Sequence, residues 1–408
     1  MVRRFTSIFL LVLAGSVCLI LQASAGPGNV LPGQPKARLI TSFPFQELSN
    51  GVILIKGCID DKPDSLNFIL DSGSGGIGLD SATCAYLKLP LTHSGRTIRG
   101  IGGKKKVPYA NDNTLNLPGG LQVDSLNFHV SDYELISEVY GIKIDGLIGY
   151  SMLKRYIVRI NYDTHIISVY TPGKIKYGHG GDLLKPIMFA IPAIPAPLRN
   201  GVSTASRYYF DTGAGLCMLL SEHFVKDSSL LAKRKRWQKV IPTEGQGLIG
   251  RLNMSITVIK GMKVGKYWFE DVPIYLFNDI SNVMEYPELG GLIGIDLLRR
   301  FNITLNYPAG EIYIIPNTHF YDPFDYSYTG LVIYFIDGKV RITDVMKGSP
   351  AEKAGFQPGD LLIAVNNNFS NNIQQYRELL KNAGTKVSLI IMRNKELQII
   401  KLPIKSIL

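Results

Sequence analysis

The strongest constraint on the fold of this chain is an internal repeat. The segment "DGLIGYSMLKRYIVRINYDTHIISVYTP" begins at Asp145, and "GGLIGIDLLRRFNITLNYPAGEIYIIP" begins at Gly290. The two segments align without a gap through Tyr162 and Tyr307. Self-similarity over such a length indicates two copies of one structural unit that follow each other along the chain.

A second pair of similar segments precedes the first pair. The segment "NFILDSGSGG" contains Asp71, and "RYYFDTGAGL" contains Asp211. From each Asp to the following Gly-Leu-Ile-Gly segment there are about 75 residues in the first copy and about 80 in the second. We therefore expect two lobes, at residues 37–173 and 183–316.

Each lobe is predicted to consist mostly of β-strands. Short runs rich in Val, Ile, Tyr and Phe alternate with Gly, Pro, Asn and Asp, a composition typical of strands separated by turns. Both "SLNFILDSG" and "SRYYFDTG" are expected to form strands that end in a sharp glycine turn. After each Leu-Ile-Gly, "YSMLKRY" and "IDLLRRF" are expected to form one or two helical turns.

The two Asp residues occupy equivalent places in the repeat. A single Asp-Ser/Thr-Gly tripeptide is a weak signal, since an ordinary turn can contain one. Two copies at equivalent positions allow a pseudo-two-fold axis to bring Asp71 and Asp211 face to face. When two carboxyl groups lie so close to each other, ionising both is unfavourable, and the pair shares a proton. Such a pair can act as general acid and general base.

These segments resemble the pepsin and retropepsin clan of aspartic peptidases, and the lobe size is closer to two fused retropepsin-like subunits. The resemblance covers about residues 37–316 and rests on "DSGSG", "DTGAG", the two Gly-Leu-Ile-Gly segments and "RGIGGKKKVPY". It implies a mostly β, bilobal aspartic-peptidase fold with Asp71 and Asp211 as the catalytic pair, which is the arrangement in which aspartic proteases share a proton. It also implies polypeptide substrates, no cofactor and no metal.

The residues around each Asp have predicted supporting roles. Gly73 and Gly213 permit a tight turn and a close approach of the backbone, so that amide groups can face the carboxylates. By the resemblance, Ser72 and Thr212 brace the two loops through hydroxyl hydrogen bonds.

The resemblance also predicts a mobile, glycine-rich flap that closes over substrate. The candidates in "RGIGGKKKVPY" are Gly100, Gly102 and Gly103. The tyrosine in this segment, Tyr109, lies further along than the flap tyrosine of pepsin-like enzymes. In the second lobe, "TEGQGLIGRL" from Thr243 takes the place of the flap.

The chain continues into a smaller C-terminal domain. Residues 317–329 are aromatic and turn-rich, and we interpret them as a linker that packs on its neighbours. Residues 330–402 resemble a PDZ domain, a small α+β fold, and "GSPAEKAGFQPGD" is the most specific part of this resemblance.

A PDZ domain binds an extended peptide by adding it as a strand to a sheet edge and receives a terminal carboxylate in a glycine turn. The resemblance therefore implies that peptide C-termini bind here. The helix from Ile373 is expected to line the groove, and the turn and edge are expected at Gly330, Leu331, Val332 and Ile333. The alternative is a domain that only packs against the two lobes.

Other catalytic chemistries fit the sequence less well. Trypsin-like serine proteases need a histidine upstream of the nucleophile, but the first histidine, His93, follows Ser72. The six histidines never show the i, i+4 spacing of a zinc motif. Cys217 lies in an apolar run and is expected to be a buried hydrophobic residue rather than a nucleophile. A catalytically silent peptide-binding scaffold is the remaining alternative, although it could lose either Asp without harm.

The N-terminus predicts export. Two arginines precede an apolar run and an Ala-Ser-Ala site, which is typical of a signal peptide at residues 1–25. We expect a periplasmic or extracellular protein without a stable membrane span after cleavage, and an uncleaved anchor or a lipoprotein modified at Cys18 are the membrane-associated alternatives. Cys58 and Cys84 could form a disulfide in such a compartment. The net charge is +11, but no nucleic-acid-binding module is present, so no nucleic acid partner is expected.

Overall fold

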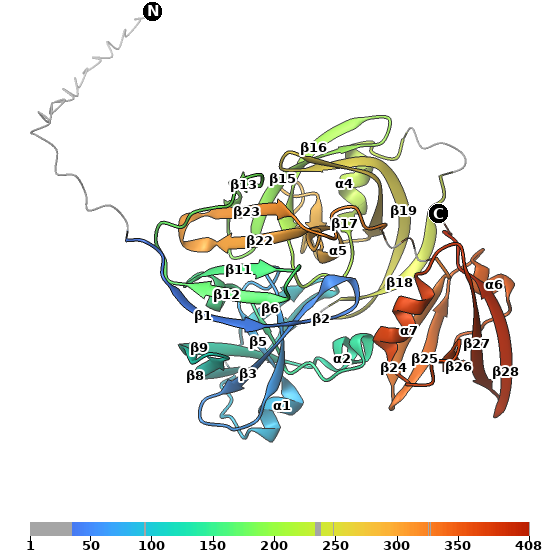
Figure 1. The fold of residues 1–408 in the computed structure, drawn as a ribbon, viewed down its shortest axis with the longest axis horizontal. Coiled ribbons are helices and arrows are strands. Elements are labelled where there is room, and N and C mark those ends of the chain that lie inside the picture. Colours follow the sequence, from blue (N-terminus) through green and yellow to red (C-terminus); the bar gives the residue numbers. More distant parts are fainter. Residues whose placement is uncertain are drawn as a thin grey trace, which may run out of the picture. The chain divides into compact units, whose positions relative to one another are not determined.

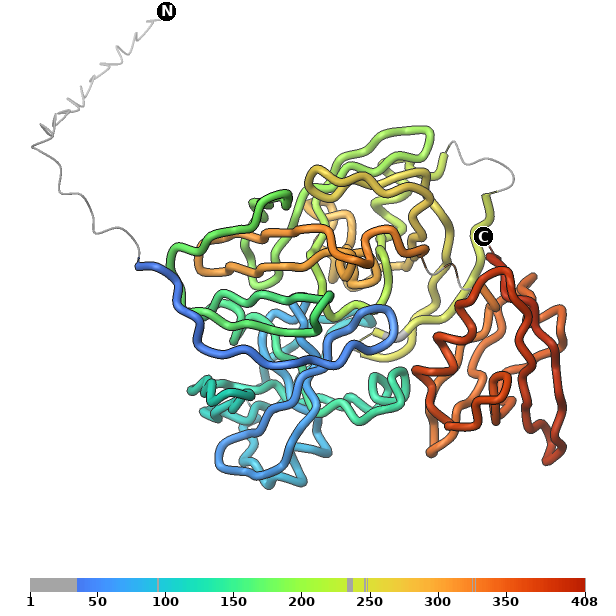
Figure 2. The backbone as a smooth tube through the Cα atoms, in the orientation of Figure 1, coloured from blue at the N-terminus to red at the C-terminus, as the bar shows by residue number. Residues whose placement is uncertain are grey.

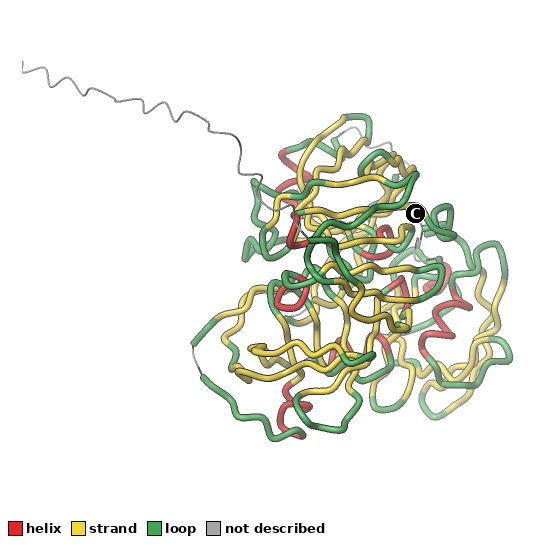
Figure 3. Tube along the Cα trace, turned by 60° about the vertical axis from the view of Figure 1, so that its left-hand side comes forward, coloured by secondary structure: helices red, strands yellow, loops and turns green. Residues whose placement is uncertain are grey.

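The computed structural model describes residues 35–407, with residues 94, 233–237, 248, 325 and 327 not described. Residues from Lys36 onward form one compact unit, which is mostly β as predicted (Figures 1 and 3). The predicted signal peptide, residues 1–25, lies outside the described residues. None of the helices in the described part of the chain is long and apolar enough to cross a membrane.

The first lobe is built on a seven-stranded sheet in which β3 also pairs with β8, so that the sheet curls into a barrel. In sheet order its strands are β2 (Gln46–Glu47), β3 (Ile53–Ile59), β4 (Leu66–Leu70), β10 (Gly146–Ile148), β5 (Ile77–Asp80), β9 (Leu121–Ser131) and β8 (Tyr109–Leu117). The lobe also contains the hairpin β6 (Thr97–Gly100) and β7 (Gly103–Lys106), the 3-10 turn η1 (Ser49–Gly51), and the helices α1 (Ser81–Tyr86), α2 (Glu134–Tyr140) and α3 (Tyr150–Leu153).

The second lobe repeats this plan with an eight-stranded sheet, in which β15 also pairs with β19. In sheet order its strands are β14 (Ile187–Met188), β15 (Pro192–Arg199), β16 (Ser203–Phe210), β21 (Gly291–Ile293), β17 (Met218–Ser221), β20 (Tyr267–Phe277), β19 (Gly250–Val264) and β18 (Ile241–Gly247). Its helices are α4 (Glu222–Asp227) and α5 (Ile295–Leu298).

The repeat is visible in small details of the two lobes. The side chain of Asp80 caps α1 by accepting from the Thr83 N–H at 3.0 Å. At the equivalent place the Ser221 hydroxyl caps α4 by accepting from the Phe224 N–H at 3.1 Å. Both residue types are preferred helix N-caps because they satisfy an amide that the helix leaves unpaired.

A six-stranded sheet joins the lobes. Its two central strands, β11 and β22, are equivalent in the repeat and pair antiparallel, with Ile157 opposite Asn306 and Ile160 opposite Ile303. Pairing of a strand with its own repeat in this register is what a pseudo-two-fold axis requires. In sheet order the strands are β1 (Leu39–Pro44), β12 (Ile166–Tyr170), β11 (Ile157–Asn161), β22 (Phe301–Asn306), β23 (Glu311–Pro316) and β13 (Asp182–Leu184), with the 3-10 turn η2 (Tyr307–Ala309) between β22 and β23.

The C-terminal domain has its own sheet and core, and forms the red part of the chain in Figure 2. Tyr376 and Leu389 are among its fully buried residues. In sheet order its strands are β24 (Leu331–Ile336), β25 (Lys339–Val345), β26 (Leu361–Val365), β27 (Lys386–Arg393) and β28 (Glu396–Pro403), and its helices are α6 (Pro350–Lys353) and α7 (Ile373–Leu380).

The linker packs on both neighbours. Phe324 belongs to the core of the lobes, and Tyr328 belongs to the core of the C-terminal domain. The Arg300 side chain is only 1% exposed, and its guanidinium lies 4.0 Å from the centre of the Phe324 ring. This guanidinium also donates to the backbone carbonyl of Asp322. A buried arginine thus holds the linker against the second lobe.

Close packing around the Gly-Leu-Ile-Gly strand gives a stability prediction. A Cβ on Gly146 would lie 2.5 Å from the Gly78 carbonyl oxygen and 2.6 Å from the Phe68 ring. We expect Gly146→Ala to destabilise the fold by about 1–3 kcal/mol through overpacking. Gly178→Ala is the control, since its Cβ would approach nothing closer than 3.6 Å. Thermal unfolding followed by circular dichroism tests this, and equal midpoints for the two variants would contradict it.

Candidate active site

The two Asp-bearing loops begin at equivalent points of the two sheets. Each follows a strand that pairs in parallel with a Gly-Leu-Ile-Gly strand, β4 with β10 and β16 with β21. The Asp71 N–H donates to the Ile148 carbonyl at 2.9 Å, and the Asp211 N–H donates to the Ile293 carbonyl at 3.0 Å. The repeated segment therefore holds both Asp backbones in the same way.

A reciprocal set of hydrogen bonds joins the two loops. The Ser72 hydroxyl donates to the Phe210 carbonyl at 2.7 Å and accepts from the Thr212 N–H at 3.0 Å. The Thr212 hydroxyl donates to the Leu70 carbonyl and accepts from the Ser72 N–H, both at 2.9 Å. Neither Ser72 nor Thr212 has any solvent exposure. We call this arrangement the hydroxyl brace, and it fixes the distance between the loops.

The brace places each Asp side chain against the glycine of the opposite loop. A Cβ on Gly73 would lie 2.3 Å from the Asp211 carboxyl carbon, and a Cβ on Gly213 would lie 2.4 Å from the Asp71 carboxyl carbon. Each glycine also donates its N–H to the Asp of its own loop at 2.8 Å. The two carboxyl groups therefore meet above two glycines at which a side chain has no room.

Burial and mutual interaction change the pKa of both carboxyl groups. Burial raises the pKa of Asp71 well above its usual range, and the charge of Asp211 and a hydrogen bond with it raise this pKa further. Burial also raises the pKa of Asp211, but the N–H groups of Gly213 and Ala214 and the hydrogen bond with Asp71 lower it. The pair therefore shares one proton that is retained well above the usual pKa range of aspartate.

The predicted flap glycines lie at the tip of the β6–β7 hairpin. Gly100 and Gly103 are the last paired residues of this hairpin, and Gly102 lies in the turn with a φ of 106°. Tyr109 lies at the base instead, at the start of β8, with the Arg96 guanidinium 5.3 Å from its ring centre.

The tip of this flap touches the corresponding hairpin of the second lobe. The Ile249 N–H donates to the Ile101 carbonyl at 3.2 Å. A Cβ on Gly102 would lie 2.6 Å from the Ile249 carbonyl oxygen, and a Cβ on Gly247 would lie 2.2 Å from the Ile101 carbonyl oxygen. Ile101 also packs against the buried cluster of the second lobe that includes Tyr209 and Leu292. The tips of the two hairpins are therefore in direct contact.

Several tyrosines near the pair were not predicted as site residues. The Tyr133 hydroxyl lies 3.2 Å from Nε2 of His129, and burial lowers the pKa of His129 to about 4, so this imidazole is neutral. Burial raises the pKa of Tyr133 and Tyr307, and the charge of Asp71 adds to both shifts. The repeat marks Tyr307 as the equivalent of Tyr162, but periodicity says nothing of where its hydroxyl points.

The residues predicted to bind peptide in the C-terminal domain lie in a turn and at a sheet edge. A Cβ on Gly330 would lie 2.2 Å from the Ser349 side chain, and Leu331, Val332 and Ile333 begin the edge strand β24. Arg377 of α7 donates to the Ile333 carbonyl at 2.9 Å. Helix α2 of the first lobe lies against β24. The predicted groove is thus in contact with the first lobe.

The other candidate nucleophiles are poorly placed. The Ser72 hydroxyl is committed to the hydroxyl brace, and Cys217 is 1% exposed, with burial raising the pKa of its thiol well above the usual range. Cys58 and Cys84 are free thiols, so the disulfide considered for them is not formed in this structure. Within the described residues, no group of three or more His, Cys, Asp or Glu side chains is placed to hold a metal ion.

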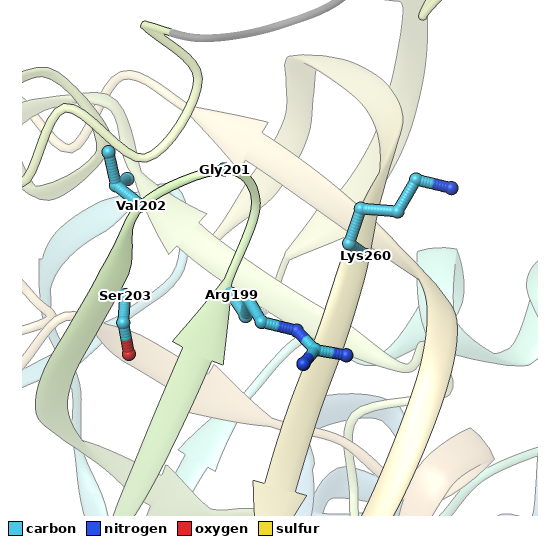
Figure 4. A pocket seen from close by; sticks show the side chains of 5 residues that line it. All are labelled: Arg199, Gly201, Val202, Ser203 and Lys260. Atoms are coloured by element: carbon cyan, nitrogen blue, oxygen red, sulfur yellow. The ribbon is translucent and has the colours of Figure 1, made fainter.

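A surface hollow of about 490 Å³ lies in the second lobe, at the turn between β15 and β16 (Figure 4). This turn is at the opposite end of β16 from Asp211, and a strand advances about 3.3 Å per residue. The hollow is therefore separate from the carboxyl pair. It is lined by Arg199, Gly201, Val202, Ser203 and Lys260.

Comparisons with known families agree with this geometry. The sequence model of the aspartyl protease family matches residues 55–152, which include the Asp71 loop, its flap and the first Gly-Leu-Ile-Gly strand. The model of the PDZ domain matches residues 341–393. None of the curated proteins compared with the chain matches it. The chain therefore carries a retropepsin-like aspartyl protease domain and a C-terminal PDZ domain.

Proposed function

We propose that the protein is an aspartic endopeptidase that hydrolyses peptide bonds with a water molecule activated between Asp71 and Asp211. The observation that carries this proposal is the hydroxyl brace, which holds two buried carboxyl groups of raised pKa against each other. A silent scaffold of the same fold has no need of such a pair, since burying a second carboxyl group beside the first is unfavourable.

A pair that shares one proton supplies both halves of general acid–base catalysis. Ionised Asp211 takes a proton from the water as the water oxygen bonds to the carbonyl carbon of the substrate. Asp71 gives its proton to the carbonyl oxygen, and a tetrahedral diol forms. In the second step the amide nitrogen is protonated by the carboxyl group that took the water proton. The carbon–nitrogen bond then breaks, and one hydroxyl proton returns to the pair.

Substrate entry requires movement of the flaps. The two hairpin tips touch at Ile101 and Ile249, and we propose that this contact opens to admit an extended peptide to the pair. Closing again excludes bulk water from the reaction. We propose that the β6–β7 flap with Gly100, Gly102 and Gly103 closes over bound peptide in this way.

Peptide binding by the C-terminal domain is proposed as an accessory function. The Gly330 turn and the edge strand β24 support it, since a sheet edge can accept an added strand. A peptide added to β24 meets helix α2, so peptide binding at this edge competes with the packing of this domain on the first lobe.

The catalytic proposal predicts the loss of activity in two nearly isosteric variants. Asp71→Asn and Asp211→Asn should each lower kcat/KM for a cleaved peptide by at least about 100-fold, because one carboxyl group cannot serve as both acid and base. Asp61→Asn is the matched control. Asp61 is an exposed carboxylate in the turn that follows β3, so this variant should keep normal activity. Near-normal turnover in either of the first two variants would exclude the proposed pair.

The raised pKa of Asp71 also predicts a pH dependence of stability. The folded protein keeps a proton on the pair at pH values where the unfolded chain has lost it, so stability falls as pH rises through the folded pKa. As pH rises above about 4, the usual pKa of aspartate, the unfolding midpoint of the wild type should fall relative to that of Asp71→Asn, which keeps only one of the two carboxyl groups. The fall should be about 2–4 °C for each kcal/mol of stability lost. Midpoints that change in parallel would count against a raised pKa.

We also propose export to the periplasm or the cell exterior, supported by the basic, apolar and Ala-Ser-Ala elements of residues 1–25. N-terminal sequencing of the mature protein from a secreting host should begin at Gly26. A mature chain that starts at Met1, or one that carries lipid on Cys18, would show an anchor instead.

A further inference from the structure

Helix α7 of the C-terminal domain contacts the first lobe at the 3-10 turn η1. The Gln374 carbonyl oxygen accepts from the Ser49 N–H at 2.7 Å and from the Ser49 hydroxyl at 2.5 Å, and its amide donates to the Tyr140 carbonyl at 2.6 Å. Lys381, just beyond the helix, donates to the Asn50 side-chain carbonyl at 2.5 Å. Gln374 and Lys381 lie about two helical turns apart, so they present one face of α7 to η1.

Asn50, in the same turn, also contacts the second lobe. Its backbone is left-handed, with a φ of 63°, a conformation in which Asn and Asp are enriched. Its side-chain amide donates to the Gly215 carbonyl at 2.8 Å. The orientation of this amide follows from its partners, since Lys381 can only donate and the Gly215 carbonyl can only accept.

Gly215 belongs to the "DTGAG" loop that carries Asp211. A Cβ on Gly215 would lie 3.0 Å from the Tyr140 hydroxyl, so the tyrosine held by Gln374 also borders this residue. The preceding residue, Ala214, donates its N–H to the Asp211 carboxylate at 3.1 Å. The second active loop is therefore bordered by two groups that are both anchored on α7.

We propose that the C-terminal domain positions the second active-site loop, with Asn50 as the positioning residue. The proposal rests on the peptidase function proposed above. Without the Asn50 bond, the Gly215 carbonyl loses a partner and the Ala214 N–H is less firmly held on Asp211. The domain then contributes to the hydrolysis of every substrate, including peptides too short to reach its own groove.

The test uses the full-length protein with Asn50→Asp. Asp tolerates the left-handed backbone and still pairs with Lys381, but it has no N–H to donate to Gly215. We expect kcat for a short peptide to fall about three- to tenfold with KM unchanged, which is the effect of one lost hydrogen bond. Asn50→Gly keeps the backbone without either side-chain bond and should give at least the same loss.

Two further readouts separate positioning from general destabilisation. Amide hydrogen exchange in the peptide that covers residues 211–216 should be faster in both Asn50 variants, whether or not the protein is active. The acid limb of the kcat profile should move to higher pH, because weaker donation by Ala214 raises the pKa of Asp211. Among the described residues, the ionisable groups that face Asp211 are Asp71, Tyr140 and Tyr307, and none of them is changed. The shift is measured in Asn50→Gly, because the new carboxyl group of Asn50→Asp would itself raise the pKa of Asp211.

Matched variants on α7 complete the experiment. Gln374→Ala and Lys381→Ala should also accelerate exchange at residues 211–216. Gln375→Ala should leave exchange and kcat unchanged, because the Gln375 side chain accepts hydrogen bonds from Asn368 and Ser370, within the C-terminal domain.

The outcomes distinguish this inference from the proposed function. Wild-type kcat and wild-type exchange in Asn50→Asp and Asn50→Gly would overturn the positioning role, while activity that is lost in Asp71→Asn would still support the peptidase. An inactive wild type would overturn the peptidase, and hydrogen exchange would still decide whether α7 restrains the loop.

Discussion

The hydroxyl brace between Ser72 and Thr212 is the interaction on which the rest of the structure depends. Two carboxyl groups in contact repel each other when both are ionised, and burial strengthens this repulsion because the protein screens charge less than water does. The loops stay together because each hydroxyl donates to one backbone carbonyl and accepts from one backbone N–H across the interface. The pair then relieves the repulsion by sharing a proton, and in the proposed function this supplies the acid and the base.

The sheets of the two lobes also hold the two Asp residues in place. The Gly-Leu-Ile-Gly strands fix the backbone of each Asp, and the pairing of β11 with β22 sets the two repeats about one axis. The symmetry is incomplete, because the two copies differ in what surrounds them. The Tyr162 hydroxyl donates to the Gly51 carbonyl at 2.9 Å, whereas the hydroxyl of its equivalent, Tyr307, has no hydrogen-bond partner among the described residues. Burial raises the pKa of Tyr307, and the charges of Asp71 and Asp211 raise it further.

The turn η1 is where the three parts of the chain meet. Tyr162 of the first lobe bonds the Gly51 carbonyl, and the Arg299 side chain of the second lobe packs so closely that a Cβ on Gly51 would lie 2.5 Å from it. Ser49 and Asn50 form hydrogen bonds with Gln374 and Lys381 of the C-terminal domain, respectively. A movement of that domain must therefore change this turn, and the turn contacts the second active loop through Asn50.

The parts of the structure that can be predicted are those that leave a repeat or a motif in the sequence. Contacts that leave neither are missed. A gapless repeat makes Asp71 and Asp211 equivalent, so their approach across an axis follows from duplication, and the resemblance supplies the roles of Ser72 and Thr212. The contacts of Gln374 with Tyr140 and of Asn50 with Gly215 join residues 234 and 165 positions apart. Single polar contacts at such separations have no periodicity and no motif, and Ser49-Asn50-Gly51 indicates only a turn. The packing of α2 on β24 is missed for the same reason, since each element alone is an ordinary helix or strand.

The central claim is that Asp71 and Asp211 share one proton. The most direct measurement is a pH titration of their side-chain carboxyl carbon resonances by nuclear magnetic resonance, in protein labelled with ¹³C at aspartate, with the two single Asn variants used for assignment. If the pair shares a proton, both resonances should report two separated steps, with one proton retained well above the usual pKa range of aspartate. Two independent titrations, each at an ordinary aspartate pKa and unaffected by removal of the other carboxyl group, would contradict it.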